Sequence, residues 1–491
     1  MSLPATNTPW VTLTGEPGKK RLLVHGRPFI SLGIQIDFRH CTSIGDFDYL
    51  FEHIIRMGLN TVFFPIRWFT FEPQEGRYDF TIIDHALRRC TEHSLYMSLL
   101  WFGTNQGGGL NPAPAWFRDD TTRFRRVRDA AGNGHIKLCP LSKEGLAVEK
   151  KSMETLLRHI AETDRDRRVI FMQVENEPCL EMKSQPRRPG ELIDSWSFRC
   201  HCPVCNEAFA NSCLDEWDFS ATSLAGYFRD LLQDQKSIHP LLTYTNFLLN
   251  PQRPGEDLDI WLATAPQLDL IGIDYYGFCS ADLDFAMRFF NRGRNALFVA
   301  EHSTESVGDA AANVFRAICG HGAIAFDPWA IDYAFGWRAW RDHIKERSFV
   351  EKDGTWSDAA IAYGKSCRAL GAAAELIATH IGTGNLLWYA TENALPRSLE
   401  ERRWGITWRW MSGPQGRWAL IKISDTQFVL AGVGLQVVVK PGDDTKTCTM
   451  ECGAWKSGEW HRTAEAPIIK KFENTALLEL EDGACILITV S

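Results

Sequence analysis

Two glutamates each lie at the end of a strongly apolar segment. Glu177 ends residues 169–177, and Glu301 lies in residues 296–302. Two carboxyl groups can hydrolyse a glycosidic bond with retention of configuration when they flank it about 5–5.5 Å apart, because one protonates the leaving oxygen while the other attacks the anomeric carbon. We therefore expect Glu177 to be the general acid/base and Glu301 to be the nucleophile.

The residues beside Glu177 favour the same reaction. We expect the apolar strand end and a neighbouring negative charge to raise the pKa of Glu177, as a general acid requires. Asn176 is suited to hold the 2-hydroxyl of a sugar, and Glu175 is a further candidate for substrate binding. Strict strand alternation would point Asn176 away from Glu177, so both reach one pocket only if the strand end is irregular.

A cysteine cluster is the second group with a chemical signature. Cys200, Cys202 and Cys205 follow the pattern C-x-C-x2-C. Thiolates at this spacing hold Zn²⁺ in a tetrahedron when a fourth ligand completes it, and Cys213 is one candidate. Four thiolates leave the ion no open position, so we expect a structural zinc that takes no part in catalysis.

Eight short apolar segments alternate with amphipathic ones and must position these groups. Continuous apolar runs are typical of parallel strands that are buried on both faces. The expected strands are residues 28–36, 60–68, 96–103, 169–177, 241–247, 268–276, 296–302 and 323–330. The expected helices between them include residues 46–57, 81–93, 146–163, 224–238 and 309–319. This alternation predicts an α/β fold, a (β/α)8 TIM barrel, in which strand carboxyl ends converge on one pocket.

A doubly wound open sheet is the competing fold, but it usually shows a glycine-rich phosphate turn after the first strand, and residues 33–38 are not one.

Position in a (β/α)8 barrel indicates further sugar contacts. Tyr276 ends the sixth strand and is expected to donate a hydrogen bond to Glu301, while Trp329 ends the eighth and would form a hydrophobic floor. The full set of expected contacts adds Gln35, Trp101 and Asn105.

The character of the sequence changes after about residue 380. Short strand-like segments between turn signals predict an antiparallel β-sandwich. They are residues 386–390, 405–411, 418–423, 427–433, 435–440, 475–480 and 484–490. We expect a catalytic barrel over residues 1–378 and a C-terminal β-sandwich domain over residues 379–491.

The composition excludes several classes of protein. The net charge of −8 argues against nucleic acid or an anionic membrane as the main partner. Neither a signal peptide nor an apolar run long enough to span a membrane is visible. We expect a cytoplasmic protein, in which cysteines stay reduced unless a metal holds them. Its 18 tryptophans are a high count, and we expect most of them in the core, although tryptophan is also the usual platform for a sugar face.

The two glutamates also carry a family resemblance. Asn-Glu after the fourth strand and Glu after the seventh resemble clan A glycoside hydrolases. Residues 60–68 and 71–80 resemble the second-strand region of β-galactosidases, and residues 173–177 (Gln-Val-Glu-Asn-Glu) are similar to the acid/base motif of glycoside hydrolase family 35. Residues 100–103, Trp116, and residues 123–129 and 323–332 resemble the bacterial-type branch of that family, which has a C-terminal β-domain.

The resemblance implies an exo-acting, retaining β-galactosidase that needs no cofactor for catalysis and acts on a β-linked oligosaccharide or glycoside. Many family members hold the sugar with a carboxylate at the end of the third strand, where this chain has residues 101–106, Trp-Phe-Gly-Thr-Asn-Gln. Three alternatives stay open: another β-glycoside such as a glucoside, glucosaminide or arabinopyranoside, a transglycosylase, or a non-catalytic carbohydrate-binding barrel. A homo-oligomer through the β-domain is plausible.

The cysteine run resembles the zinc site of glycoside hydrolase family 42. In that family a fourth cysteine lies upstream, and the matching residue here is Cys139. We favour Cys139 over Cys213 because a zinc ion bound to it would join the long loop after the third strand to the loop after the fourth.

Overall fold

The computed structural model of this chain describes residues 9–37, 39–106, 112–180, 199–248, 256–277, 280–303, 310–332, 349–351, 353–390, 397–472, 474–480 and 482–491. Residues 181–198, which follow the expected fourth strand, therefore lie outside the described residues.

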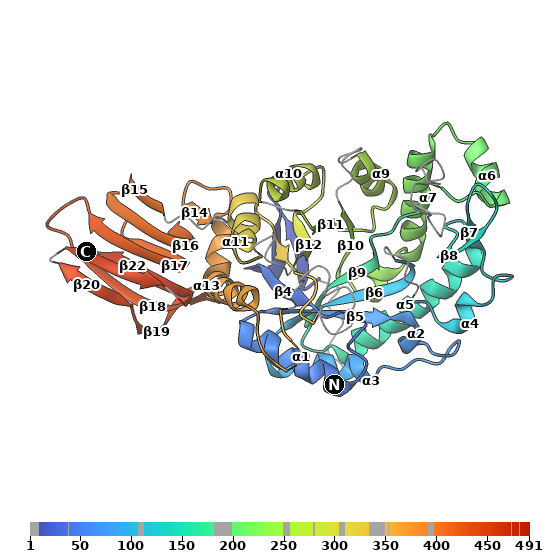
Figure 1. Cartoon of the computed structure of the whole chain (residues 1–491), viewed down its shortest axis with the longest axis horizontal. Helices are drawn as coiled ribbons and strands as arrows, with labels where there is room; N and C mark the ends of the chain where they lie inside the picture. Colours follow the sequence, from blue (N-terminus) through green and yellow to red (C-terminus); the bar gives the residue numbers. More distant parts are fainter. Residues whose placement is uncertain are drawn as a thin grey trace. The chain divides into compact units, whose positions relative to one another are not determined.

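Eight strands close into a barrel, which confirms the predicted fold (Figure 1). The pairs β6–β9, β9–β10, β10–β11, β12–β13 and β13–β4 are all parallel. The continuous apolar runs reflect this burial, since β9 is buried along its whole length. The barrel strands are β4 (Ser31–Gln35), β5 (Thr61–Arg67), β6 (Tyr96–Gln106), β9 (Val169–Asn176), β10 (Leu242–Leu248), β11 (Leu270–Tyr275), β12 (Phe298–His302) and β13 (Ala325–Phe326).

Helices follow the barrel strands, and four of them begin at a residue whose side chain caps the helix. The side chains of Ser43, Ser142, Asp215 and Ser357 each accept a hydrogen bond from a first-turn N–H and so start α1, α5, α7 and α13. In chain order, the helices that follow the eight barrel strands are α1 (Ile44–Met57), α3 (Thr81–Glu92), α5 (Lys143–Thr163), α7 (Glu216–Leu231), α9 (Glu256–Thr264), α10 (Ser280–Phe290), α11 (Ala310–Phe315) and α13 (Asp358–His380).

Short elements complete the connections between these strands and helices. The sheet β1 (Val11–Thr14), β2 (Arg21–Val24) and β3 (Arg27–Phe29) precedes the first barrel strand, and β7 (Arg126–Arg128) pairs with β8 (Gly134–Leu138). The single-turn helices and other short ones are α2 (Trp68–Phe71), α4 (Ala115–Arg118), α6 (Pro203–Ala210), α8 (Gln235–Ile238) and a π-helical turn at Arg316–Gly320.

The C-terminal strands form one connected antiparallel sheet. Its order is β14-β16-β17-β22-β18-β19, while β15 pairs with β16 and β21 pairs with β17 and β20. The stacked rings of Trp408, Trp410 and Trp418 lie in its buried core. The strands are β14 (Leu386–Ala390), β15 (Arg397–Arg403), β16 (Ile406–Lys422), β17 (Gln427–Pro441), β18 (Cys448–Lys456), β19 (Glu459–Glu465), β20 (Ile468–Phe472), β21 (Thr475–Leu480) and β22 (Ala484–Val490).

Two of the expected strand boundaries in this sheet were wrong. The expected strands 405–411 and 418–423 merge into the single strand β16, which spans Ile406–Lys422, and residues 427–433 and 435–440 belong to β17. The glycine-rich residues 413–416 shift the register of β16 between Ser412 and Arg417 without reversing the chain. A Cβ on Gly416 would lie 2.4 Å from Ser412 Cβ, so this close approach requires glycine.

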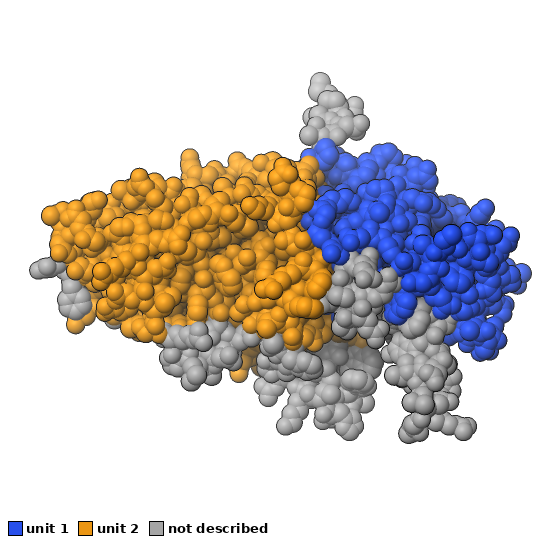
Figure 2. Space-filling view, turned by 90° about the horizontal axis from the view of Figure 1, so that it is seen from above, with its two compact units in different colours: residues 1–10, 63–274, 292–295 blue, residues 11–62, 275–291, 296–491 orange. Residues whose placement is uncertain are grey.

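The chain forms two compact units (Figure 2). The first comprises Met1–Trp10, Phe63–Asp274 and Arg292–Asn295, and the second comprises Val11–Val62, Tyr275–Asn291 and Ala296–Ser491. Both units contribute strands to the barrel, and the second also contains the C-terminal sheet. The expected domain boundary after residue 378, which falls near the end of α13, stays a prediction.

Candidate active site

The backbone at the carboxyl end of β9 is irregular. Glu175 has a φ of 59° and Glu177 a φ of 45°, so both lie in the left-handed region. This conformation costs about 1–2 kcal/mol for a residue other than glycine, so the surrounding structure must hold it. Regular strand alternation therefore ends before Glu177. An irregular strand end is the condition under which Asn176 and Glu177 were expected to reach one pocket.

Buried amide side chains hold this strand end. Asn176 Oδ1 accepts hydrogen bonds from Gln173 Nε2 at 3.0 Å and from Asn246 Nδ2 at 2.9 Å. Gln173 Nε2 also donates to the Glu175 carbonyl, and Asn246 Oδ1 accepts from the Glu177 N–H at 3.2 Å. Because Asn176 Oδ1 already accepts twice, its Nδ2 is the part suited to donate to a ligand. Gln173 entered the sequence analysis only as part of the 173–177 motif, and Asn246 was not singled out, because its only signal is a polar side chain within an apolar strand.

The environment of Glu177 suits a general acid. Burial raises its pKa, while a hydrogen bond shared with the carboxyl of Asp274 and the charge of Lys137 oppose that rise. The net direction is upward, which keeps the proton on the carboxyl nearer to neutral pH. Asp274 lies on β11 and was not singled out from the sequence.

Three expected sugar contacts on β6 and β9 are buried. Trp101 has no exposed surface, packs against Trp68 and donates from Nε1 to Glu149 Oε1 at 3.0 Å. Glu175 is also fully buried, and Asn105 is 3% exposed. Trp101 and Glu175 thus lie in packing with no surface open to a ligand, and we do not retain them as proposed sugar contacts.

Glu301 lies near the carboxyl end of β12 and is 5% exposed. Tyr276 Oη donates to Glu301 Oε2 at 2.5 Å, and this is the hydrogen bond that the sequence predicted. A donated hydrogen bond favours the ionised carboxylate, which a nucleophile requires. Burial and the charge of Glu301 raise the pKa of the nearby Asp327 well above its usual value.

Trp329 follows β13, and its backbone bridges to Gln35 and Ser303. The ring of Tyr276 is nearly perpendicular to that of Trp329, with the centroids 6.4 Å apart, and Arg39 Cζ lies 5.5 Å from the Trp329 centroid. Gln35 is 1% exposed, and its Oε1 has no hydrogen-bond partner within the described part of the chain. Gln35, Tyr276, Glu301 and Trp329 all belong to the second unit.

A charged cluster in the same unit escaped the sequence reasoning. Arg39 Nε donates to Asp37 Oδ1 at 2.8 Å, and the Asp37 N–H donates to Asp332 Oδ1 at 2.9 Å. His40 Nδ1 lies 3.2 Å from Asp332 Oδ2. Burial raises the pKa of Asp332, and the hydrogen bond with His40 opposes that rise. The only signal was the run of polar residues directly after the first barrel strand.

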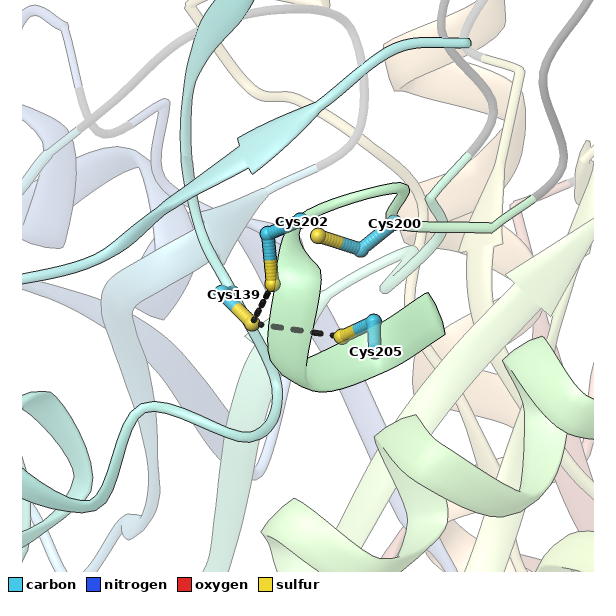
Figure 3. A group of neighbouring side chains, drawn as sticks. All are labelled: Cys139, Cys200, Cys202 and Cys205. Carbon is cyan, nitrogen blue, oxygen red and sulfur yellow. Dashed lines mark hydrogen bonds between the residues drawn. The ribbon is translucent and has the colours of Figure 1, made fainter. Parts of the chain in front are cut away.

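Four cysteines of the first unit converge on one point (Figure 3). Their Sγ atoms all lie within 4.8 Å of one another, and all four side chains are buried. Cys139 Sγ lies 3.4 Å from Cys205 Sγ and 3.7 Å from Cys202 Sγ, with Cys200 beside them. Cys213 is exposed and outside this group, so the geometry favours Cys139 as the fourth member.

Comparison with known proteins supports the fold. No family model matches the chain, and no curated protein matches its sequence. The structure is similar to a β-galactosidase from the psychrophilic Marinomonas ef1, with a TM-score of 0.53 and 13% identity over 74% of this chain and 62% of that one. A β-galactosidase from Bacillus circulans sp. alkalophilus gives 0.51 and 16% over 72% and 57%.

The catalytic domain of a β-amylase from Paenibacillus polymyxa is also similar, with a TM-score of 0.50 and 11% identity over 68% of this chain and 97% of that domain. The chain spans about three fifths of the length of the two β-galactosidases. Similarity at these identities establishes the barrel fold, and one such fold carries many activities. Within the described residues, no helix is both long and apolar enough to cross a membrane.

Proposed function

We propose that this protein is a retaining, exo-acting β-glycoside hydrolase with Glu177 as general acid/base and Glu301 as nucleophile. The observation that supports the proposal is that the two carboxyl groups have different environments, one that favours the protonated form and one that favours the anion. Burial raises the pKa of Glu177, whereas Glu301 receives a hydrogen bond from Tyr276 that favours its anion. Each lies at the carboxyl end of a strand of a closed barrel, where such barrels carry their active sites.

The reaction would proceed in two displacements. Glu301 attacks the anomeric carbon and forms a glycosyl ester, while Glu177 gives its proton to the leaving oxygen. Glu177 then removes a proton from water, the water attacks the same carbon, and the Glu301 carboxylate departs. Asn176 Nδ2 would hold the 2-hydroxyl, and Tyr276, Trp329, Gln35 and Asn105 would line the sugar site.

Galactose is the sugar that we propose first. The sequence resemblance to family 35 and the structural similarity to two β-galactosidases support it. The lack of a carboxylate at the end of β6 keeps another β-glycoside as the alternative, because the choice between epimers depends on one or two hydroxyl contacts. The cytoplasmic location and a homo-oligomer through the C-terminal sheet stay predictions.

A panel of aryl β-glycosides tests the function. We expect nitrophenol release from the β-galactoside, with the sugar first appearing as its β-anomer in proton NMR of the fresh product. Turnover of a different β-glycoside would change the proposed substrate but leave the proposed mechanism unchanged. A first product of inverted configuration would contradict the double displacement, and no turnover of any glycoside would contradict the enzymatic function.

We also propose that Cys139, Cys200, Cys202 and Cys205 bind a structural zinc ion. A tetrahedral Zn²⁺ with Zn–S bonds of about 2.3 Å places sulfurs about 3.8 Å apart. The distances of 3.4 Å and 3.7 Å from Cys139 Sγ fit this arrangement. When bound, the ion would contribute folding energy and join the segment after β8 to the start of α6, without a part in catalysis.

Removal of the metal is expected to destabilise the protein strongly. Metal analysis of dialysed, untagged protein should find about one zinc per chain. Cys205→Ser should lose that zinc and lower the unfolding temperature by roughly 10 °C or more, because structural zinc contributes several kcal/mol. Cys213→Ser is the matched control, since Cys213 is exposed and outside the cluster. Far less than one zinc per chain in the wild type would contradict the site.

A further inference from the structure

Two glutamates that the proposed reaction does not use lie buried together in the first unit. Glu149 is on α5 and Glu175 is on β9, and neither has any exposed surface. Within the described residues, neither forms an ion pair or a hydrogen bond with a lysine, arginine or histidine. Two buried carboxylates without a cation are costly, because burial and their mutual repulsion both disfavour the charged forms.

The hydrogen-bond donors around Glu149 and Glu175 indicate that one of the two carboxyl groups carries a proton. Thr104 Oγ1 lies 2.8 Å from Glu149 Oε2 and 3.3 Å from Glu175 Oε1. A hydroxyl has a single proton and can donate to only one of these oxygens. A proton on one of the carboxyl groups would make the other contact a hydrogen bond as well.

The remaining donors are few and fixed in place. Glu149 also accepts from Trp101 Nε1 and from Tyr227 Oη on α7. Glu175 accepts from the Gly103 N–H at 3.1 Å and from the Thr104 N–H at 2.6 Å. The two bonds to Glu175 join the end of β9 to β6.

Gly103 shows how closely the two carboxyl groups approach. A Cβ at this residue would lie 2.1 Å from Glu149 Oε1 and 2.8 Å from Glu175 Oε1, so both oxygens crowd the same point. Burial and the negative charge of Glu149 raise the pKa of Glu175 well above its usual value. Two carboxyl groups this close and this deeply buried cannot both ionise near neutral pH.

We propose that Glu149 and Glu175 share one proton and act as positioning residues for the acid/base. Glu175 has left-handed backbone and immediately precedes Asn176 and Glu177. The shared proton lets Glu175 stay buried with its hydrogen bonds intact, which offsets the cost of the left-handed backbone. The effect on turnover rests on the proposed function, whereas the shared proton itself does not.

The proposal predicts the direction in which the stability of the protein changes with pH. The titratable groups that face the pair are Glu149 from α5, Glu175 from β9 and Tyr227 from α7, while β6 supplies Trp101, Gly103 and Thr104. Burial and Glu149 raise the pKa of Tyr227, so it stays a neutral donor. Because the folded pKa of Glu175 lies above its unfolded value, the pair's contribution to stability is complete below the unfolded value and is lost as pH rises toward the folded one.

Glu149→Gln tests the shared proton. The glutamine amide is neutral at every pH and can donate an N–H where the wild type needs a proton. As pH rises from 5 to 8, the unfolding temperature of the variant should therefore rise relative to that of the wild type by roughly 5 °C or more. Glu162→Gln, an exposed glutamate on the same helix, is the matched control and should follow the wild type.

Equal pH slopes for Glu149→Gln and the wild type would overturn the shared proton. If Glu149→Gln does not fold, Glu175→Gln gives the same comparison from the other side of the pair. On a glycoside that the enzyme turns over, Glu149→Ala should lower kcat about tenfold with little change in KM, and Glu149→Gln should restore most of it. Absence of any turnover would count against the proposed function only, because the thermal measurement needs no substrate.

Discussion

Glu301→Gly is expected to lower the turnover of aryl β-glycosides by about 10⁴-fold or more, because the covalent intermediate cannot form without the carboxylate. Added azide should restore product formation from a substrate with a good leaving group. The azide would occupy the space that the carboxylate vacates and attack the anomeric carbon from that side. The product should be the α-glycosyl azide, and it should accumulate because no group remains to displace the azide.

The anomeric configuration of the azide product decides the role of Glu301. Proton NMR distinguishes an α-glycosyl azide from a β-glycosyl azide. A β-azide, or turnover unaffected by Glu301→Gln, would show that Glu301 is not the nucleophile. Glu92→Gln is a suitable control, because Glu92 is half exposed on α3 and pairs only with neighbouring arginines among the described residues. Its activity should match that of the wild type.

The barrel was predictable because its physical signal is strong. Parallel strands buried on both faces need continuous apolar runs, and each of the eight runs contains a barrel strand. The positions of Glu177 and Glu301 at strand ends followed from those runs. The bond from Tyr276 to Glu301 was also predictable, since both residues end their strands and the tyrosine is long enough to reach.

The details of the β9 end were not predictable, and the reason is conformational. Neither Glu175 nor Glu177 is a residue that favours a positive φ, so nothing in the sequence marks the irregular backbone. Its supports come from distant segments: Glu149 lies on a helix, Asn246 on the next strand and Thr104 on the preceding one. Such contacts depend on the closed barrel. The sequence pattern predicts the class of fold but not the individual contacts within it.

Strand alternation explains why the burial of Trp101 was not predictable. An apolar run that is buried on both faces does not reveal which side chains point into the barrel and which point toward the helices. Trp101 lies in the packing beside Glu149, so its position at a strand end does not make it a sugar contact. For Cys139, by contrast, thiol chemistry limited the choice to a few residues, and the structure groups it with the other three cysteines.

Replacement of Glu177 should give an effect that depends on the leaving group. Glu177→Ala removes the proton donor, so substrates with poor leaving groups should lose about 10²–10⁴-fold in kcat/KM, whereas dinitrophenyl glycosides, which need no proton, should lose far less in that step. The second displacement loses its general base, so azide should accelerate turnover. It would attack the glycosyl ester from the face that water normally uses and give the β-glycosyl azide.

The pH dependence of the same variant tests the raised pKa of Glu177. In the wild type, kcat/KM should fall as pH rises through that pKa, because the acid loses the proton that the leaving group needs. Glu177→Ala has no such group, so the alkaline fall should be absent from its residual activity on glycosides whose leaving group needs a proton. If the fall persists unchanged, another residue is the acid. If Glu177→Ala and Glu301→Gly give azides of the same configuration, the two carboxyl groups do not act from opposite faces of the sugar, and the double displacement must be abandoned.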